Sequence, residues 1–288
     1  MIKKILSILV LTMSTAALAQ TLIAVPPTKV IIPFQPGGGV DHVFRLMQKY
    51  AESQNIVLVP DYRPGANGQI GIQHAINDQT PDDTLLLTII SDVARHTDHI
   101  KPVSALAKST VLIVASNRSQ ISDITQLAKG SYSWGYGSSP MEAVARGMAQ
   151  DSPNNILVPF NGAGPVMAAL VSNSIDLAVL PATAGMSLLN SKYVKVIAVY
   201  DDHSNMYPGL AKVEDRYRIN LLNDGFGLFM SRRARPESAV FWEKFTRGFI
   251  NDPMIVAELK ARALYPMASN SSEYLAQLVR NFVLVAKL

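Results

Sequence analysis

The chain contains no cysteine among its 288 residues. This absence excludes disulfide bonds, a thiol nucleophile and a cysteine that could carry a lipid anchor. Charged residues are also scarce, at 17% of the chain, whereas hydrophobic residues make up 48%. A chain of this composition can bury a large core, so we expect a folded protein of one or two domains.

Long hydrophobic runs are missing as well, apart from one near the N-terminus that is shorter than the roughly 20 residues of a membrane-spanning helix. That run, "ILSILVLTMSTA", follows the basic start "MIKK" and precedes the small residues of Ala17-Leu18-Ala19. A basic start, a short apolar stretch and a small-x-small ending are typical of a secretory signal peptide. We expect residues 1–19 to be cleaved after Ala19, rather than to serve as a membrane anchor, and we expect the mature protein in a bacterial periplasm.

A strong excess of charge of one sign is not present. Without Lys3 and Lys4, 24 of the 26 basic side chains remain against 22 acidic ones, a net charge of +2. The sequence also shows no cluster of lysine and arginine. Both observations argue against a nucleic acid as a partner.

Short apolar or β-branched runs alternate with amphipathic segments along most of the chain, which predicts an α/β fold with mostly parallel sheets covered by helices on both faces. The predicted strands are "KVIIPF", "IVLVPDY", "TLLLTII", "TVLIVAS", "YSWGYG", "NILVPF", "DLAVL", "VKVIAVY" and "LLNDGFGLFMSRR". The predicted helices include "DHVFRLMQKYAESQ", "MEAVARGMAQ" and "AGPVMAALVSNS", and every segment after Pro236 has a helical pattern.

The alternation of strands and helices restarts near Ile121, which indicates two lobes. Because the helical tail needs a sheet to cover, we expect it to return to the first lobe. Lobe 1 would then comprise residues 20–115 and 226–288, with residues 116–225 inserted as lobe 2. Two such lobes leave a cleft between them, and ligands bind outside the carboxyl ends of strands in open α/β sheets.

The loop "QPGGGVD", Gln35 to Asp41, joins a predicted strand to a predicted helix. It lacks the lysine and serine or threonine of a phosphate-binding P-loop and the last glycine of a dinucleotide-binding fingerprint. What it offers is backbone N–H groups that a ligand can approach, because glycines carry no side chain and the first turn of a helix has unpaired donors. Asp41 has two possible roles, capping this helix or contacting the ligand.

Three further loops join a strand to a helix. In "YRPGANGQIG", Arg63 could clamp a carboxylate or could simply order the turn. In "GYGSSP" and "VPFNGAGP", Ser138, Ser139 and Asn161 could contact a ligand or could cap their helices. Since no glycine follows the serines as in G-x-S-x-G, "GYGSS" does not match the nucleophile motif of the α/β-hydrolases.

Motifs for catalysis or metal binding are not found. The pair His96 and His99 has a spacing that can chelate a metal, but a solvated loop explains it equally well. Trp134 and Tyr136 could line a pocket or belong to the core. We therefore expect no enzyme activity, no catalytic residues, no metal and no cofactor.

Five segments together resemble the substrate-binding receptors of tripartite tricarboxylate transporters, the Bug receptors. These segments are "VIIPFQPGGGVDHVFRLMQ", "VPDYRPGANGQIGIQHA", "SWGYGSS", "VPFNGAGPVMAALVSNSIDLAVLP" and "KVIAV". The resemblance covers essentially the whole mature chain, and the joint occurrence of the motifs is specific although each alone is weak.

The resemblance implies a two-lobed Venus flytrap, a type II-like periplasmic-binding-protein fold, acting as a monomer. It implies a small organic acid or amino-acid-like ligand and membrane permease subunits as partners. A sensor kinase partner is the alternative, for an orphan receptor or sensor. The residues that we expect to bind the ligand are Phe34, Gln35, Pro36, Gly37, Gly38, Gly39, Asp41, Asn67, Gly68, Ser91, Gly137, Ser138, Ser139, Phe160, Asn161, Gly162, Ala163 and Pro181.

The chain departs from the family pattern at three places that we expect on the rim of the cleft. The segment "SDVARHTDHIKPVSALAKS" is shorter than usual, a Gly-rich stretch with a histidine is missing after Ser138, and Leu180 replaces a common acidic residue. These changes predict an altered or smaller ligand, or a site that has partly lost binding.

Overall fold

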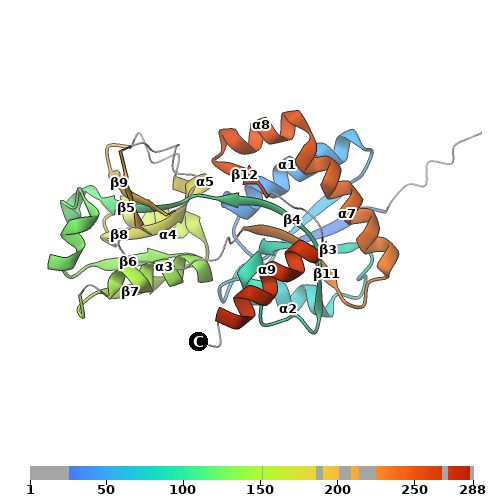
Figure 1. The fold of residues 1–288 in the computed structure, drawn as a ribbon, viewed down its shortest axis with the longest axis horizontal. Coiled ribbons are helices and arrows are strands. Elements are labelled where there is room, and N and C mark those ends of the chain that lie inside the picture. The colour runs from blue at the N-terminus through green and yellow to red at the C-terminus, as the bar shows by residue number, and fades with distance from the viewer. Residues whose placement is uncertain are drawn as a thin grey trace, which may run out of the picture.

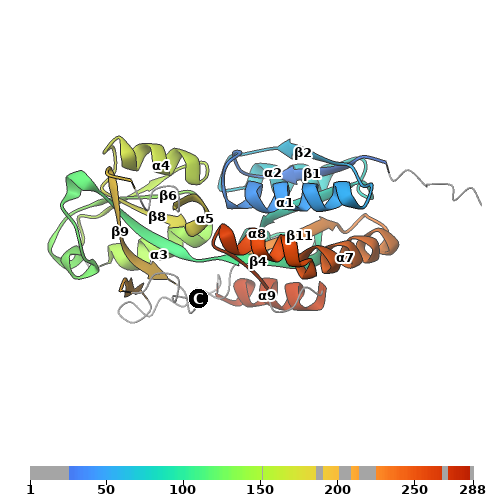
Figure 2. The ribbon, with the colours of Figure 1, turned by 90° about the horizontal axis from the view of Figure 1, so that it is seen from above.

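The computed structural model describes residues 26–150, 152–185, 191–200, 209–213, 225–267 and 272–285. Its strands form two six-stranded sheets, which Figures 1 and 2 show side by side as two lobes. The predicted two-lobed α/β architecture is therefore confirmed. The predicted signal peptide lies outside the described residues, and none of the described helices is long and apolar enough to cross a membrane.

The first sheet has the strand order β12-β4-β11-β3-β1-β2. Strand β1 is parallel to both β2 and β3, whereas β11 is antiparallel to both β3 and β4. Its strands are β1 (Thr28–Ile32), β2 (Leu58–Tyr62), β3 (Thr84–Ile89), β4 (Ile100–Ser109), β11 (Phe226–Ser231) and β12 (Leu264–Pro266).

The second sheet has the order β10-β9-β5-β8-β6-β7, with β5 antiparallel to its neighbours β8 and β9. Three of the five described strand pairings in the second sheet are parallel, as predicted. The prediction of mostly parallel sheets is wrong for the first lobe, where three of the five described pairings are antiparallel because β11 and β4 run against their neighbours. The strands are β5 (Val111–Ser116), β6 (Ser133–Tyr136), β7 (Ile156–Pro159), β8 (Leu177–Pro181), β9 (Val194–Tyr200) and β10 (Ala211–Lys212).

Helices cover both faces of the first sheet. One core cluster joins the sheet to α1 (Gly39–Ser53), α7 (Pro236–Asn251) and α8 (Pro253–Ala261). A second cluster joins its other face to α2 (Gln69–Asn77) and α9 (Ser272–Val285), as Figure 1 shows. The C-terminal helices thus return to the first lobe as expected, although the tail is not wholly helical because it includes β12.

The second sheet is also covered on both faces, by α3 (Ser139–Ala149) on one and α4 (Ala163–Val171) on the other (Figure 2). The described residues of this lobe also form three short helices, η2 (Asn117–Ser119), η3 (Ile124–Lys129) and α5 (Ala182–Gly185). Trp134 is fully buried and, with Tyr136, packs in the cluster under α3. Of the two roles open to these rings, the structure supports the core.

The lobes are joined by a strand that the sequence pattern did not reveal. Strand β4 follows η1 (Ile90–Val93) and lies in the first sheet, and after Thr110 the chain continues as β5 in the second. Figures 1 and 2 show this ribbon crossing between the lobes. The change of sheet at Thr110 falls within the predicted lobe 1 segment 20–115, and the division into domains otherwise stays a prediction.

Candidate ligand-binding site

Loops from the two lobes meet where the predicted binding motifs lie. A β-carbon built on Gly162, in the loop after β7, would lie 3.9 Å from the backbone nitrogen of Gln35, in the loop after β1. One built on Gly137, in the loop after β6, would clash with the backbone of Gly162 at 2.4 Å. The glycine-rich loops of both lobes therefore approach one another backbone to backbone.

A second contact between the lobes lies at the start of α1. A β-carbon on Gly39 would lie 2.9 Å from the hydroxyl oxygen of Thr183, in α5, and 2.8 Å from the ring of Phe226. The Thr183 hydroxyl is buried and has no hydrogen-bond partner among the described residues. The sequence analysis missed Thr183 and Phe226, because neither belongs to a glycine-rich motif.

The loops of the first lobe also converge on each other. A β-carbon on Gly68 would lie 3.4 Å from the ring of Phe34 and 3.5 Å from the carboxylate of Asp92. Asn67 and Gly68 have φ values of 50° and 85°, a left-handed turn that glycine and asparagine adopt most easily. This turn sets the direction in which α2 leaves the site, next to Ser91.

The helices that begin at this meeting point share a feature, since no side chain caps their N-termini. The N-cap residues of α1, α2, α3 and α4 are Gly38, Gly68, Ser138 and Gly162, and none makes a side-chain capping bond. By contrast, Asp252, which is not part of these loops, accepts bonds from the first turn of α8. Helix α7 is also uncapped, and its first residue, proline, has no N–H group to donate. Helix α3 likewise has a proline, Pro140, in its first turn, so it offers one donor fewer than a helix without proline.

Uncapped N-termini leave backbone N–H donors without an intrahelical acceptor and carry partial positive charge. We define the interlobe site as residues 34–41, 67–68, 91–92, 137–139, 160–163 and 183. Two uncapped helices come from each lobe, so an anion placed between the lobes could accept bonds from both.

Asp41 has a structural role in this loop. Its carboxylate accepts hydrogen bonds from the Gly37 N–H, at 2.9 Å, and from the Tyr62 hydroxyl, at 2.5 Å. Arg45 lies 3.3 Å from the same carboxylate. Burial first, and then the bond to Asp41, raise the pKa of Tyr62 to about 12. The Gly37 N–H is therefore already used, and the unpaired donors of this loop begin in the first turn of α1.

For the other predicted residues, the structure shows burial and neighbours but no contact between the lobes. Gln35, Pro36 and Asn161 are exposed, whereas Phe160 is partly buried and packs on the core of the second lobe. Pro181 ends β8 opposite Val111, beside the lobe crossing. Leu180 is fully buried in the cluster beneath α4, so its predicted place on the cleft rim is wrong. Strand alternation directs its side chain into the core.

The alternatives for Arg63 and His96 can also be compared with the structure. The Arg63 guanidinium lies 2.8 Å from Asp61 on its own segment, which supports its role in ordering the turn. His96 lies 2.5 Å from the Gln69 side chain. Among the described residues, no three His, Cys, Asp or Glu side chains are grouped so that they could hold a metal ion.

Comparison with known proteins places this geometry in a family context. No protein-family model matches the chain. It is 28% identical over 221 residues to a UPF0065 protein from the tcbD–tcbE intergenic region of Pseudomonas sp. (strain P51). The match covers 68% of this chain and 66% of that relative, slightly less than two thirds of the relative's length.

Two solved structures share the whole architecture. The periplasmic binding protein BugD superposes with a TM-score of 0.81 at 18% identity, over 91% of this chain and 96% of BugD. The chain has the fold of BugD. MatC from Rhodopseudomonas palustris, solved with bound malate, has a TM-score of 0.80 at 18% identity, over 89% and 96% of the two chains.

The predicted resemblance to the Bug receptors is confirmed by the UPF0065 relative and by the shared fold of BugD. BugD is described as a binding protein and MatC was solved with a bound small acid. Neither description is of an enzyme.

Proposed function

We propose that the protein is a periplasmic solute-binding protein, which captures a small carboxylate-containing metabolite at the interlobe site and delivers it to a membrane permease of the tripartite tricarboxylate type. The observation that supports this most directly is the meeting of uncapped helix N-termini from both lobes. A ligand that accepts bonds from both lobes stabilises their closed arrangement, and capture and release need no bond making.

The chemistry of the site favours a carboxylate over a phosphate or a cation. Four helix N-termini offer backbone donors, while the described arginine in these loops, Arg63, pairs with Asp61. Aimed N–H groups without an arginine or lysine clamp suit a small, weakly charged anion. MatC, which has the same fold, was solved with bound malate, a small carboxylate.

The ligand is proposed to be smaller than, or different from, the usual ligands of the family. The segment shortened relative to the Bug pattern, residues 91–109, begins at Ser91 of the site and contains most of η1 and all of β4. A thermal-shift screen against mono-, di- and tricarboxylates and amino acids would identify the ligand, because a compound that binds only the folded state raises the melting temperature. Tight binding of citrate or succinate would contradict the proposed change of ligand.

The Gly38→Trp variant tests the role of the backbone donors. Gly38 has φ −86°, and a β-carbon there would meet only the carbonyl oxygen of Gln35, at 3.8 Å. A large side chain should therefore be accepted by the fold but should block the approach of a ligand to α1. We expect binding of the best screen compound to be lost by calorimetry, with an unchanged melting temperature of the free protein.

A Gly38→Ala variant is the matched control, since one methyl group leaves most of the approach open. Ala should weaken binding less than Trp. Equal affinity of the wild type and Gly38→Trp would refute the proposed contact, and no binding of any screened compound to the wild type would refute carboxylate capture.

Export is proposed from the N-terminal segment, residues 1–19. BugD, whose fold this chain shares over 91% of its length, is named as periplasmic. Cleavage after Ala19 would give an exported protein whose sequence begins at Gln20, which intact-mass spectrometry would detect. An exported protein that retains Met1 would contradict the proposed cleavage.

A further inference from the structure

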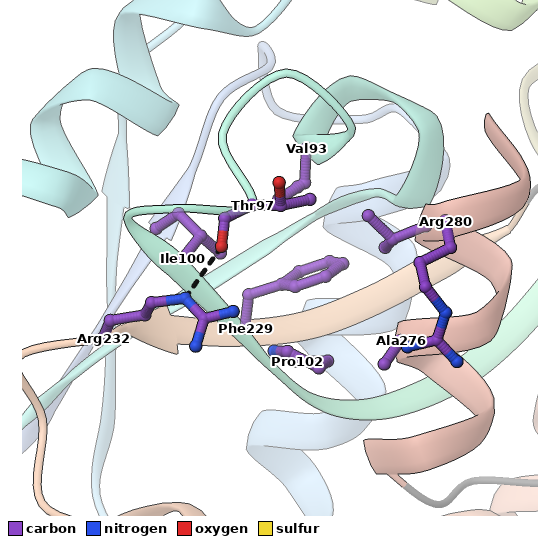
Figure 3. A pocket seen from close by; sticks show the side chains of 9 residues that line it. Val93, Thr97, Ile100, Pro102, Phe229, Arg232, Ala276 and Arg280 are labelled. Atoms are coloured by element: carbon purple, nitrogen blue, oxygen red, sulfur yellow. Dashed lines mark hydrogen bonds between the residues drawn. The ribbon is translucent and has the colours of Figure 1, made fainter. Parts of the chain in front are cut away.

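The first lobe carries a pocket that none of the residues of the interlobe site lines. It lies between α9 and the segment that runs from η1 into β4, and Figure 3 shows it from close by. Its walls are mainly apolar, formed by Val93, Ile100, Pro102, Phe229 and Val279. Thr97, Ala276 and two arginines complete the lining.

The pocket has a volume of about 190 Å³. A dry cavity of roughly 150 Å³ lined by aliphatic and phenyl side chains is large enough for benzene. This pocket can therefore hold the body of a six-membered ring, against the face or edge of Phe229. Because it is open to solvent, a polar substituent on that ring can remain at the mouth.

Two of the residues that line the pocket are arginines, Arg232 and Arg280. Figure 3 shows them on opposite sides of the Phe229 ring. The Arg232 Nε donates to the carbonyl oxygen of Thr97 at 2.7 Å. Neither arginine forms an ion pair with any described residue, whereas Arg235 and Arg262, for example, pair with Asp82 and Glu258.

Uncompensated guanidinium groups beside an apolar pocket attract an anion with an apolar body, since guanidinium matches a carboxylate in shape and charge. We propose that this pocket is a second ligand site, which binds a small aromatic monocarboxylate with its ring on Phe229 and its carboxylate between Arg232 and Arg280. This site does not depend on the proposed interlobe function, because it shares none of its residues.

Calorimetric titration with benzoate tests the proposal. We expect saturable binding of one benzoate that survives in Gly38→Trp, where the interlobe site is blocked, and is lost in Ala276→Trp, where the indole fills the pocket. Benzyl alcohol, which has the same ring without the charge, should bind at least about tenfold more weakly, since hydrogen bonds to charged groups contribute more than neutral ones. Acetate, which lacks the ring, should show no saturable binding.

Separate variants test how much the two arginines contribute to benzoate binding. Arg280→Gln and Arg232→Gln should each weaken benzoate binding several-fold, and raising the salt concentration should do the same, because exposed charges are screened. Arg118→Gln, an exposed arginine of the second lobe, is the control and should bind as the wild type does. The Arg→Gln variants give an answer even if Ala276→Trp does not fold.

Two results would overturn the proposal. One is the absence of saturable benzoate binding to the wild type. The other is binding that persists in Ala276→Trp but disappears in Gly38→Trp, which would place benzoate at the interlobe site and would leave carboxylate capture there intact.

Discussion

At the scale of single residues, the hydroxyl of Thr183 is buried at the start of α1 without a partner among the described residues. A buried hydroxyl that lacks a hydrogen bond costs free energy of folding. A ligand at the interlobe site that hydrogen-bonds to this hydroxyl would offset that cost. Thr183 is also the second-lobe side chain nearest to Gly39.

Thr183→Val is expected to weaken binding of the interlobe ligand by about two- to tenfold, the range of one net hydrogen bond. The variant keeps the shape of threonine, so the free protein should be as stable as the wild type or more so. Calorimetry with the best compound from the carboxylate screen would measure the first effect, and urea unfolding the second.

Thr88 provides the control for this change. Its hydroxyl is also buried without a partner among the described residues, but it lies within β3, opposite Gly227 of β11. Thr88→Val should leave ligand affinity unchanged. If both variants weaken binding equally, the effect of Thr183 does not come from a ligand contact.

At the scale of elements, Asp78 links strands β1 and β3 of the first sheet by hydrogen bonds. Its carboxylate accepts bonds from Lys29 on β1, at 2.7 Å, from the N–H and hydroxyl of Thr80, and from Thr84 on β3, at 3.0 Å. Burial alone would raise the pKa of Asp78, but these bonds outweigh it and hold the pKa well below its usual range.

A depressed pKa in the folded state means that this stabilisation is present above the ordinary aspartate pKa of about 3.9 and is lost as the pH falls below it. Asp78→Asn should lower the free energy of unfolding by about 1.5–3 kcal/mol at pH 7, since an amide nitrogen would face donors. The variant should also lose less stability than the wild type between pH 4 and pH 3. Urea unfolding at these pH values measures both.

Asp98→Asn, at an exposed aspartate of the same lobe, is the control and should follow the wild type. A deficit of Asp78→Asn that is as large at pH 3 as at pH 7 would show that the lost bonds do not depend on the charge of this carboxylate.

Element types followed the sequence pattern wherever a hydrophobic period was clear. Strand β1, in which four of the five residues are buried, and helix α1, which has a buried apolar face, were both predicted from such runs. Strand β4 was missed because "IKPVSALAKS" contains proline, lysines and serines, which mask its buried positions. Its burial comes from β11 and α9, which are far away in sequence and which no local pattern reveals.

The sequence predicted the loops of the proposed interlobe site but not all of the side chains that the structure brings to it. Glycines before helices identified residues 37–39 and 162, which the structure brings to the interlobe site. Thr183 could not be found in this way, because its importance depends on the packing of α5 against α1. Leu180 was misplaced since only the register of β8 decides which face of the strand it occupies.

At the scale of the whole molecule, we expect the crossing at Thr110 to act as a hinge, about which the lobes move while each sheet stays intact. We expect ligand binding to shorten or narrow the distance distribution between Lys244→Cys on α7 and Gln150→Cys at the end of α3. Because the natural chain has no cysteine, the two dyes attach only at these positions. Single-molecule energy transfer with and without the identified ligand measures the change.

A pair within the first lobe, Glu52→Cys with Lys244→Cys, should show no change on binding. An unchanged interlobe distance under saturating ligand would mean that the lobes do not close, and the receptor role would then need a different means of signalling occupancy to the permease.

The order of strands in the first sheet has a consequence for synthesis. Strand β4 touches that sheet only through β11 and β12, so β11 is inserted between β4 and β3. While a nascent chain is being made, β3 and β4 therefore expose open edges until Phe226–Ser231 has been translated. The sheet of the second lobe, Val111 to Lys212, can pair earlier. The second lobe can therefore fold first, although it begins later in the chain. The sheet of the first lobe is completed only when β11 inserts between β3 and β4.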